Sequence, residues 1–140
     1  MTRAIAIAMA LTATAIVGRA SSDRTVWDGV YNDAQATRGA KIYKDSCARC
    51  HGETLQGDGT ASALSGPGFL SDFDGVTLAD IVDRTRKTMP EDDPGTMSRQ
   101  QIVDALTYVL SVNRFPKGDR ELPTQADVLS QIMFVAVKPK

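Results

Sequence analysis

Histidine and cysteine are almost absent from this chain, and their scarcity restricts the metal chemistry open to it. The 140 residues include one histidine, His51, and two cysteines, Cys47 and Cys50. A structural zinc site of the usual kind needs four cysteine or histidine ligands, so such a site is excluded. A disulfide between the two cysteines would close a tiny loop, which has little effect on the entropy of the unfolded chain.

Charge of one sign and long apolar runs are also scarce. The 16 basic and 17 acidic residues give a formal net charge of −1, and no basic patch suggests a nucleic-acid partner. Beyond residue 20, no apolar segment approaches the roughly 20 residues that a membrane-spanning helix needs. No repeat, low-complexity tract or second-domain boundary is evident. We therefore expect a single soluble domain after the first 20 residues.

The start of the chain is the apolar exception. Met1-Thr2-Arg3 is followed by an apolar run from Ala4 to Val17, and Gly18 and Ala20 are small residues before a predicted cut after Ala20. This pattern is typical of a secretory signal peptide and predicts export to the periplasm. An uncleaved membrane anchor is the alternative, and Arg19 favours it. Cleavage would leave 14 basic and 17 acidic residues, a charge of −3, which favours partners with a basic docking face.

The scarce residues fall together in one motif. Cys47-Ala48-Arg49-Cys50-His51 has the C-x-x-C-H spacing that is typical of covalent haem c attachment. Each thiol adds to one vinyl group of the porphyrin, and the adjacent imidazole reaches the iron. A thioredoxin-like dithiol would require an α/β pattern around the pair, and none is evident. The motif predicts one haem c, attached at Cys47 and Cys50, with His51 as an axial ligand.

The other axial ligand cannot be a second histidine, because the chain has none. Methionine is the natural partner, since a neutral thioether favours Fe(II) and raises the reduction potential. Three methionines are poor candidates, because two lie in the signal segment and one lies in an apolar run that suits the core: Met1, Met9 and Met133.

Met89 and Met97 remain as candidate ligands. Met89 ends a helical segment just before Pro90, where a proline-fixed loop would aim the thioether with little freedom. Met97 immediately precedes a predicted helix, where a hydrophobic staple is its alternative role. We prefer Met89 and leave Met97 open.

Apolar periodicity predicts helices and no strands. The expected helices span 34–50 with Asp33 as N-cap, 77–88, and Ser98 to about 113 with a Ser98/Gln101 capping box. A short helix capped by Thr124 is expected after Pro123. The glycine-rich stretch 52–75 is predicted to be a loop that wraps the haem closely, with an apolar lining from Leu64, Phe69, Leu70 and Phe73.

Over residues 26–132 the chain resembles class I c-type cytochromes. In that family the C-x-x-C-H motif comes first, the ligand methionine follows, and a terminal helix crosses the first helix. Cys47 to His51, Met89 and the helix that carries Tyr108 stand in this order. Gly39 and Tyr43 match the glycine and the aromatic residue of the helix crossing. The resemblance implies an all-α cytochrome c-like fold, with three main helices and a short C-terminal one around a single haem.

The resemblance also implies a function. It indicates a carrier of single electrons, with His51 and Met89 as iron ligands, rather than an enzyme. We expect the chain to be divided into a signal peptide (1–20), an N-terminal extension (21–33) and the cytochrome c domain (34–137). The alternative is a haem enzyme or gas sensor whose axial methionine is open or labile. Trp27 to Tyr31, Thr88-Met89-Pro90 and Phe115-Pro116 resemble a bacterial subgroup that accompanies periplasmic quinoprotein dehydrogenases. Such a dehydrogenase as donor, and a terminal oxidase or another cytochrome as acceptor, are the implied partners.

One departure from the family pattern concerns the loop after the motif. Family members usually have a proline in a P-x-L-x-G stretch, and its carbonyl accepts a hydrogen bond from the ligand histidine. Here Ser62-Ala63-Leu64-Ser65-Gly66 occupies that place. Ser62 still has a carbonyl, but the loop lacks the rigid φ angle of proline. The orientation of His51 therefore needs support from elsewhere or is looser than in the family.

Overall fold

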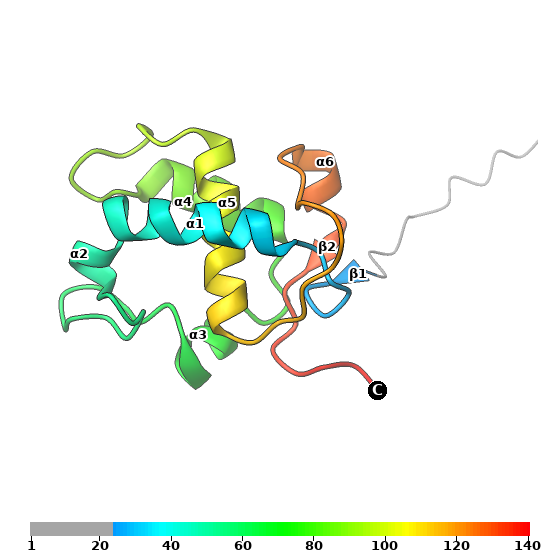
Figure 1. The fold of residues 1–140 in the computed structure, drawn as a ribbon. Helices are drawn as coiled ribbons and strands as arrows, with labels where there is room; N and C mark the ends of the chain where they lie inside the picture. Colours follow the sequence, from blue (N-terminus) through cyan, green and yellow to red (C-terminus); the bar gives the residue numbers. More distant parts are fainter. Residues whose placement is uncertain (1–23) are drawn as a thin grey trace, which may run out of the picture.

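The computed structural model describes residues 24–140, and helices provide most of their secondary structure (Figure 1). The all-α prediction is confirmed. The predicted signal peptide, Met1–Ala20, lies outside the described residues. The helices are α1 (Asp33–Ser46), α2 (Ala48–His51), α3 (Gly66–Phe73), α4 (Leu78–Thr88), α5 (Arg99–Val112) and α6 (Ala126–Leu129). No helix within residues 24–140 is long and apolar enough to cross a bilayer.

The crossing of α1 and α5 forms the frame of the domain (Figure 1). Gly39 on α1 makes this crossing close, because a Cβ atom there would stand 1.8 Å from the backbone oxygen of Asp104 on α5. Tyr43, one turn further along α1, packs its ring against Tyr108 of α5 with 5.3 Å between ring centroids. The resemblance-based assignment of Gly39 and Tyr43 to the crossing agrees with this contact.

The first helix differs from its prediction at both ends. Asn32, not Asp33, is the N-cap, and its side-chain oxygen accepts a hydrogen bond from the backbone N–H of Gln35 at 2.9 Å. Asp33 is instead the first helical residue. The helix also does not run on to Cys50, because the backbone turns at Cys47 and α2 begins as a separate turn.

Two helix starts agree with the sequence. Ser98 and Gln101 form the predicted capping box at the start of α5. Thr77 caps α4 by accepting a hydrogen bond from the backbone N–H of Asp80. The last short helix, α6, differs, since Gln125 occupies its N-cap without a side-chain hydrogen bond and Thr124 lies outside it.

Helix α3 was not expected, because Gly66-Pro67-Gly68 suggested a loop. Proline suits the first turn of a helix, where its missing N–H has no partner to lose. Phe69 and Phe73, one turn apart, then give the helix an apolar face that packs on Phe134. Tertiary contacts of this face thus outweigh the poor helix propensity of the glycines.

A small strand pair was also not expected. Strand β1 (Arg24–Thr25) pairs in parallel with β2 (Ile132–Met133), so the beginning of the described chain lies beside a segment near its end (Figure 1). The predicted N-terminal extension is, from residue 24 on, packed into the domain, since Val26 is fully buried and the Trp27 indole N–H donates to the carbonyl of Val135 at 2.8 Å.

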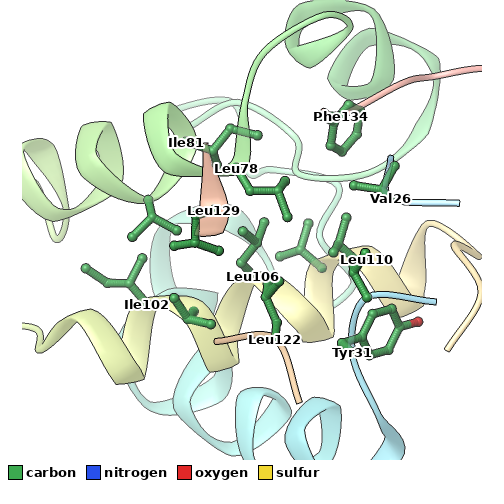
Figure 2. Close-up of a cluster of buried hydrophobic side chains, with 14 of the residues drawn as sticks. Val26, Tyr31, Leu78, Ile81, Ile102, Leu106, Leu110, Leu122, Leu129 and Phe134 are labelled. Carbon is green, nitrogen blue, oxygen red and sulfur yellow. The ribbon is translucent and has the colours of Figure 1, made fainter. Parts of the chain in front are cut away.

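The buried core lies between α4, α5 and the C-terminal segment (Figure 2). Leu78, Leu110 and Leu129 are fully inaccessible to solvent, and they come from α4, α5 and α6. Burying a leucine side chain of this kind contributes about 1.5–3 kcal/mol. The core therefore joins the late helices, and Cys47 and Ala48 of the C-x-x-C-H motif pack against it.

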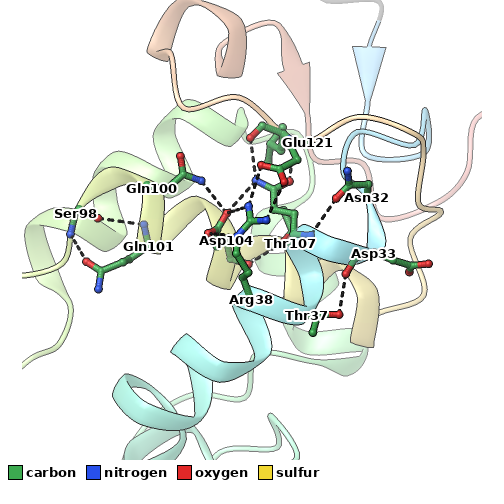
Figure 3. A network of polar contacts seen from close by, with 12 residues as sticks. Asn32, Asp33, Thr37, Arg38, Ser98, Gln100, Gln101, Asp104, Thr107 and Glu121 are labelled. Carbon is green, nitrogen blue, oxygen red and sulfur yellow. Dashed lines mark hydrogen bonds and ion pairs between the residues drawn. The ribbon is translucent and has the colours of Figure 1, made fainter.

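A polar network fastens the segment before α6 to the helix crossing (Figure 3). The fully buried amide of Gln35 donates to the Asp104 carboxylate at 3.1 Å and to the Leu122 carbonyl at 3.0 Å, and accepts from the Leu122 N–H at 2.7 Å. Arg38 pairs with Asp104 and Glu121 at 3.2 and 2.8 Å. Every polar atom of the Gln35 side chain thus has a partner, which removes most of the cost of burying it.

Candidate functional site

The C-x-x-C-H motif occupies one tight helical turn. The Cys47 N–H donates to the Tyr43 carbonyl at 2.8 Å and so ends α1, while the Cys47 carbonyl accepts from the N–H of His51 at 3.0 Å and so begins α2. The turn therefore holds Cys47, Cys50 and His51 together.

A cleft opens beside this turn and contains the predicted haem-binding residues. Its walls come from the end of α1, from α2, from the loop after α2 and from the segment between α4 and α5. The lining residues are Ser46, Cys47, Arg49, Cys50, His51, Ala61, Met89, Pro90, Glu91 and Met97. Two thiols, one imidazole and two thioethers thus share a single cavity, and this donor set fits haem c.

The imidazole of His51 is oriented by the following loop. Its Nδ1 lies 2.8 Å from the carbonyl oxygen of Ser62. A carbonyl only accepts, so this contact is a hydrogen bond in which Nδ1 donates, and Nε2 is the ring nitrogen left to bind a metal. Ser62 therefore provides the backbone acceptor at the position where the family usually has proline.

Backbone contacts hold the loop close to the motif. The Gly57 N–H donates to the His51 carbonyl at 2.8 Å, and the Leu64 N–H donates to the Leu55 carbonyl at 2.8 Å. Gly57 has a φ of +73°, and a Cβ there would lie 2.5 Å from the Ala61 oxygen. Only glycine fits this backbone without strain or displacement.

The two candidate methionines enter the cleft from one segment. Met89 is the C-cap of α4, where its N–H donates to the Thr85 carbonyl at 2.8 Å. Met97 is buried directly before the Ser98 cap of α5. Both line the cleft, so its lining does not choose between them. Met133 lies in β2 and is not part of this lining.

The expected apolar loop lining lies elsewhere. Phe69 is buried in the core, and Leu64, Leu70 and Phe73 pack against that core rather than on the cleft wall described above. These residues join the loop and α3 to the hydrophobic core. The physical reason is α3 itself, since its helical face turns Phe69 and Phe73 toward Phe134.

The protonation of Cys47 is unlike that of a nucleophilic cysteine in a dithiol redox pair. Burial, with a smaller contribution from Cys50, raises the pKa of Cys47 to about 11. Reactive cysteines in exchange enzymes have a lowered pKa, because the thiolate is the nucleophile. Cys47 is therefore a protonated thiol near neutral pH. Among the described residues, no cluster of three histidine, cysteine or acidic side chains forms a conventional metal site either.

An exposed ion pair stands beside the cleft. Arg49, within the motif, pairs with Asp92 on the segment that follows Met89. The hydrogen bond from Arg49 lowers the pKa of Asp92, and the same contact raises the pKa of Arg49. The sequence offered no signal for this pair, because 43 positions separate its members and both residues suit a solvated surface.

Asn113, the C-cap of α5, makes a second contact that the sequence did not indicate. Its side-chain amide binds the loop that carries Ser62, at the Leu64 carbonyl and the Gly66 N–H. Asparagine is common at helix ends, so its position alone points to capping rather than to a partner in a distant loop.

Comparison with known proteins identifies the family to which the chain belongs. The family model described as cytochrome c oxidase, cbb3-type, subunit III matches residues 34–109, which is just over half of the chain. No curated protein and no solved structure matches the chain. The matched residues run from α1 through most of α5 and include the C-x-x-C-H motif and the cleft. The protein therefore belongs to this family of c-type cytochrome domains, as a class I c-type cytochrome whose family binds haem c covalently.

Proposed function

We propose that this protein is an exported, periplasmic electron carrier with haem c linked to Cys47 and Cys50 and ligated axially by His51 and Met89. Haem-based electron transfer between redox proteins is the activity that the family suggests. The observation that carries the proposal is the convergence of Cys47, Cys50, His51 and two methionines on one cleft. Met89 is preferred over Met97 because the proline that follows it restricts its segment.

Each residue has a distinct task. Haem c, when bound, supplies an iron that alternates between Fe(II) and Fe(III). Cys47 and Cys50 prevent dissociation through two thioether bonds. His51 presents Nε2, because the Ser62 carbonyl holds its Nδ1 proton. Met89 contributes a neutral sulfur, which favours the reduced state and raises the potential.

Keeping both axial positions filled is what makes a carrier rather than an enzyme. A closed coordination sphere leaves no position for a substrate, and it limits the structural change between oxidation states. The α1/α5 crossing and the bonded loop supply a fixed frame on the His51 side. We therefore propose electron transfer without substrate turnover.

Export and the identity of the partners are further parts of the proposal. The pattern of residues 1–20 supports periplasmic localisation, with an uncleaved anchor as the alternative. The subgroup resemblance supports a quinoprotein dehydrogenase as donor and a terminal oxidase or another cytochrome as acceptor. Cleavage leaves net negative charge, which favours partners with a basic docking face.

The test is an optical spectrum of the protein exported in a host with haem c maturation machinery. Wild type is compared with Met89→Ala and with Met97→Ala, in oxidised and reduced forms. We expect the Fe(III)–methionine charge-transfer band in wild type and in Met97→Ala, and its loss in Met89→Ala. Loss of the band in Met97→Ala alone would reassign the ligand.

The same experiment separates the carrier from the alternative function. A haem enzyme or gas sensor needs an open or labile axial position. Wild type without the methionine band, or with ready carbon monoxide binding, would replace the carrier by that alternative. Protein that carries no haem despite competent maturation would refute both.

A further inference from the structure

We propose that Asn113 is a positioning residue for His51, because it clamps the loop whose carbonyl group orients the imidazole. This inference rests on the proposed ligation of iron by His51. It assigns to the end of α5 a role in setting the electronic properties of the haem iron, in addition to its role in ending the helix.

The clamp uses both ends of one amide. The Asn113 Nδ2 donates to the carbonyl of Leu64 at 3.0 Å, and its Oδ1 accepts from the N–H of Gly66 at 3.1 Å. The same Nδ2 also donates to the carbonyl of Val109, one turn back on α5, at 2.9 Å. The bonds to the loop lie on both sides of Ser65, and a third bond goes to the helix of Asn113 itself. Together they fix the amide plane, so the loop cannot rotate about a single contact.

The clamped stretch is the one that meets the imidazole. Leu64 follows Ser62 by two residues, and the Ser62 carbonyl lies 2.8 Å from His51 Nδ1. The Leu64 N–H is bonded to the Leu55 carbonyl, so Leu64 is held through both its N–H and its C=O. A shift of this stretch would move the Ser62 acceptor away from Nδ1.

Two features make the clamp necessary. Ser62 leaves φ free where a proline ring would fix it, so the loop depends on hydrogen bonds for its shape. The neighbouring side-chain bond from Gln56 to Ser65 at 2.8 Å is exposed, and water competes with it. The bonds of Asn113 are partly buried, and α5 is in turn fixed by the close crossing at Gly39.

The direction of the effect follows from the hydrogen bond. A carbonyl that accepts the Nδ1 proton increases the basicity of the imidazole and thereby stabilises Fe(III). Releasing the clamp lengthens or breaks this bond. Replacement of Asn113 is therefore expected to raise the reduction potential and to speed exchange of the Nδ1 proton with solvent.

The experiment uses holoprotein and three variants. Asn113→Ala removes the clamp. Asn113→Ser also releases the loop but keeps a side-chain hydroxyl able to bond the Val109 carbonyl four residues back, so it isolates the loop contact and serves if the alanine variant folds poorly. Asn32→Ala removes the N-cap of α1, which has no contact with the loop, and is the matched control for lost stability.

The readouts are the reduction potential by equilibrium titration and the solvent exchange of the His51 Nδ1 proton by NMR of the ferrous protein. We expect both Asn113 variants to show a higher potential and faster exchange, and Asn32→Ala to match wild type in both while losing stability. Unchanged potential and exchange in both Asn113 variants would overturn the inference. Wild type without His/Met spectra would instead refute the proposed function.

Discussion

The two sides of the haem cleft are held in different ways. On the His51 side, the loop of residues 52–66 is bonded to the motif, to itself and to α5. Leu55 is almost fully buried within it. The motif turn, the loop and the end of α5 thus form one hydrogen-bonded unit, which fixes the orientation of the His51 imidazole.

On the Met89 side, residues 91–96 are all exposed. Met89 is tied at the end of α4 and Met97 is buried at the start of α5, but the segment between them has mainly local bonds, from the Asp93 N–H to Pro90 and from the Thr96 hydroxyl to Asp93. Among the described residues, its one polar side-chain contact with the motif is the Arg49–Asp92 ion pair.

This difference suggests that the two ligands have different tasks, one in loading the haem and one in controlling access to the iron. A ligand held by a loop with many hydrogen bonds and a buried Leu55 keeps its geometry at little entropic cost when the cofactor binds. A ligand on an exposed segment is anchored at its ends and opens at a lower free energy, because few buried contacts are lost. We therefore expect His51 to determine how well haem is loaded and Met89 to determine how easily the second axial position opens.

The largest effect is expected from exchanging the ligands themselves. His51→Ala should reduce covalently loaded protein to below about a tenth of the wild-type amount, because the iron loses its anchored ligand. Met89→Ala should load haem at close to the wild-type level and should differ in spectrum and ligand binding. Haem content per protein, measured as the pyridine haemochrome, checks this. Equal loss of haem in both variants would contradict the comparison.

Two glycine substitutions, one on the His51 side of the cleft and one on the Met89 side, test how strongly the backbone is constrained on each side. Gly57→Ala combines a positive φ with a clash at the Ala61 oxygen, and it should lower the free energy of unfolding by about 3 kcal/mol or more. Gly95→Ala has a φ of +84° but its nearest backbone neighbour is 3.9 Å away, so the cost should be about 1–2 kcal/mol. Urea unfolding of both holoproteins gives the difference. Equal costs would show that the two segments are equally constrained.

The smallest effect is expected at the exposed ion pair. Asp92→Asn should slightly increase the rate at which added imidazole displaces the axial methionine, and high salt should remove the difference from wild type, because surface pairs are screened. Asp93→Asn is the control, since it changes the same charge on the same segment without breaking the pair. An identical rate increase in both variants would indicate a general charge effect.

The ion pair also predicts a pH dependence with a defined sign. The hydrogen bond from Arg49 lowers the pKa of Asp92 in the folded state, so the pair contributes stability above the ordinary carboxyl pKa. This contribution is lost as the pH falls through the lowered value. Imidazole displacement in wild type should therefore approach the Asp92→Asn rate in acid, and a pH-independent difference would argue against the pair.

Local patterns in the sequence were sufficient for several parts of this account. The C-x-x-C-H spacing and the Ser98/Gln101 capping box depend on residues within one helical turn, so the chain alone specifies them. The family match agrees with the assignment to c-type cytochromes that the order of motif, methionine and final helix indicated. The predicted roles of His51 and Met89 as iron ligands remain predictions.

Other parts required the tertiary structure, because they join residues far apart in the chain. Helix α3 forms where glycines predicted a loop, since the rings of Phe69 and Phe73 pack against Phe134, which is distant in the sequence. The Asn113 clamp spans 47 positions or more, and the Arg49–Asp92 pair spans 43. Composition and spacing determine which chemistry this protein carries, while packing of distant segments decides how firmly each ligand is held, because only folding places their hydrogen-bonding groups within reach.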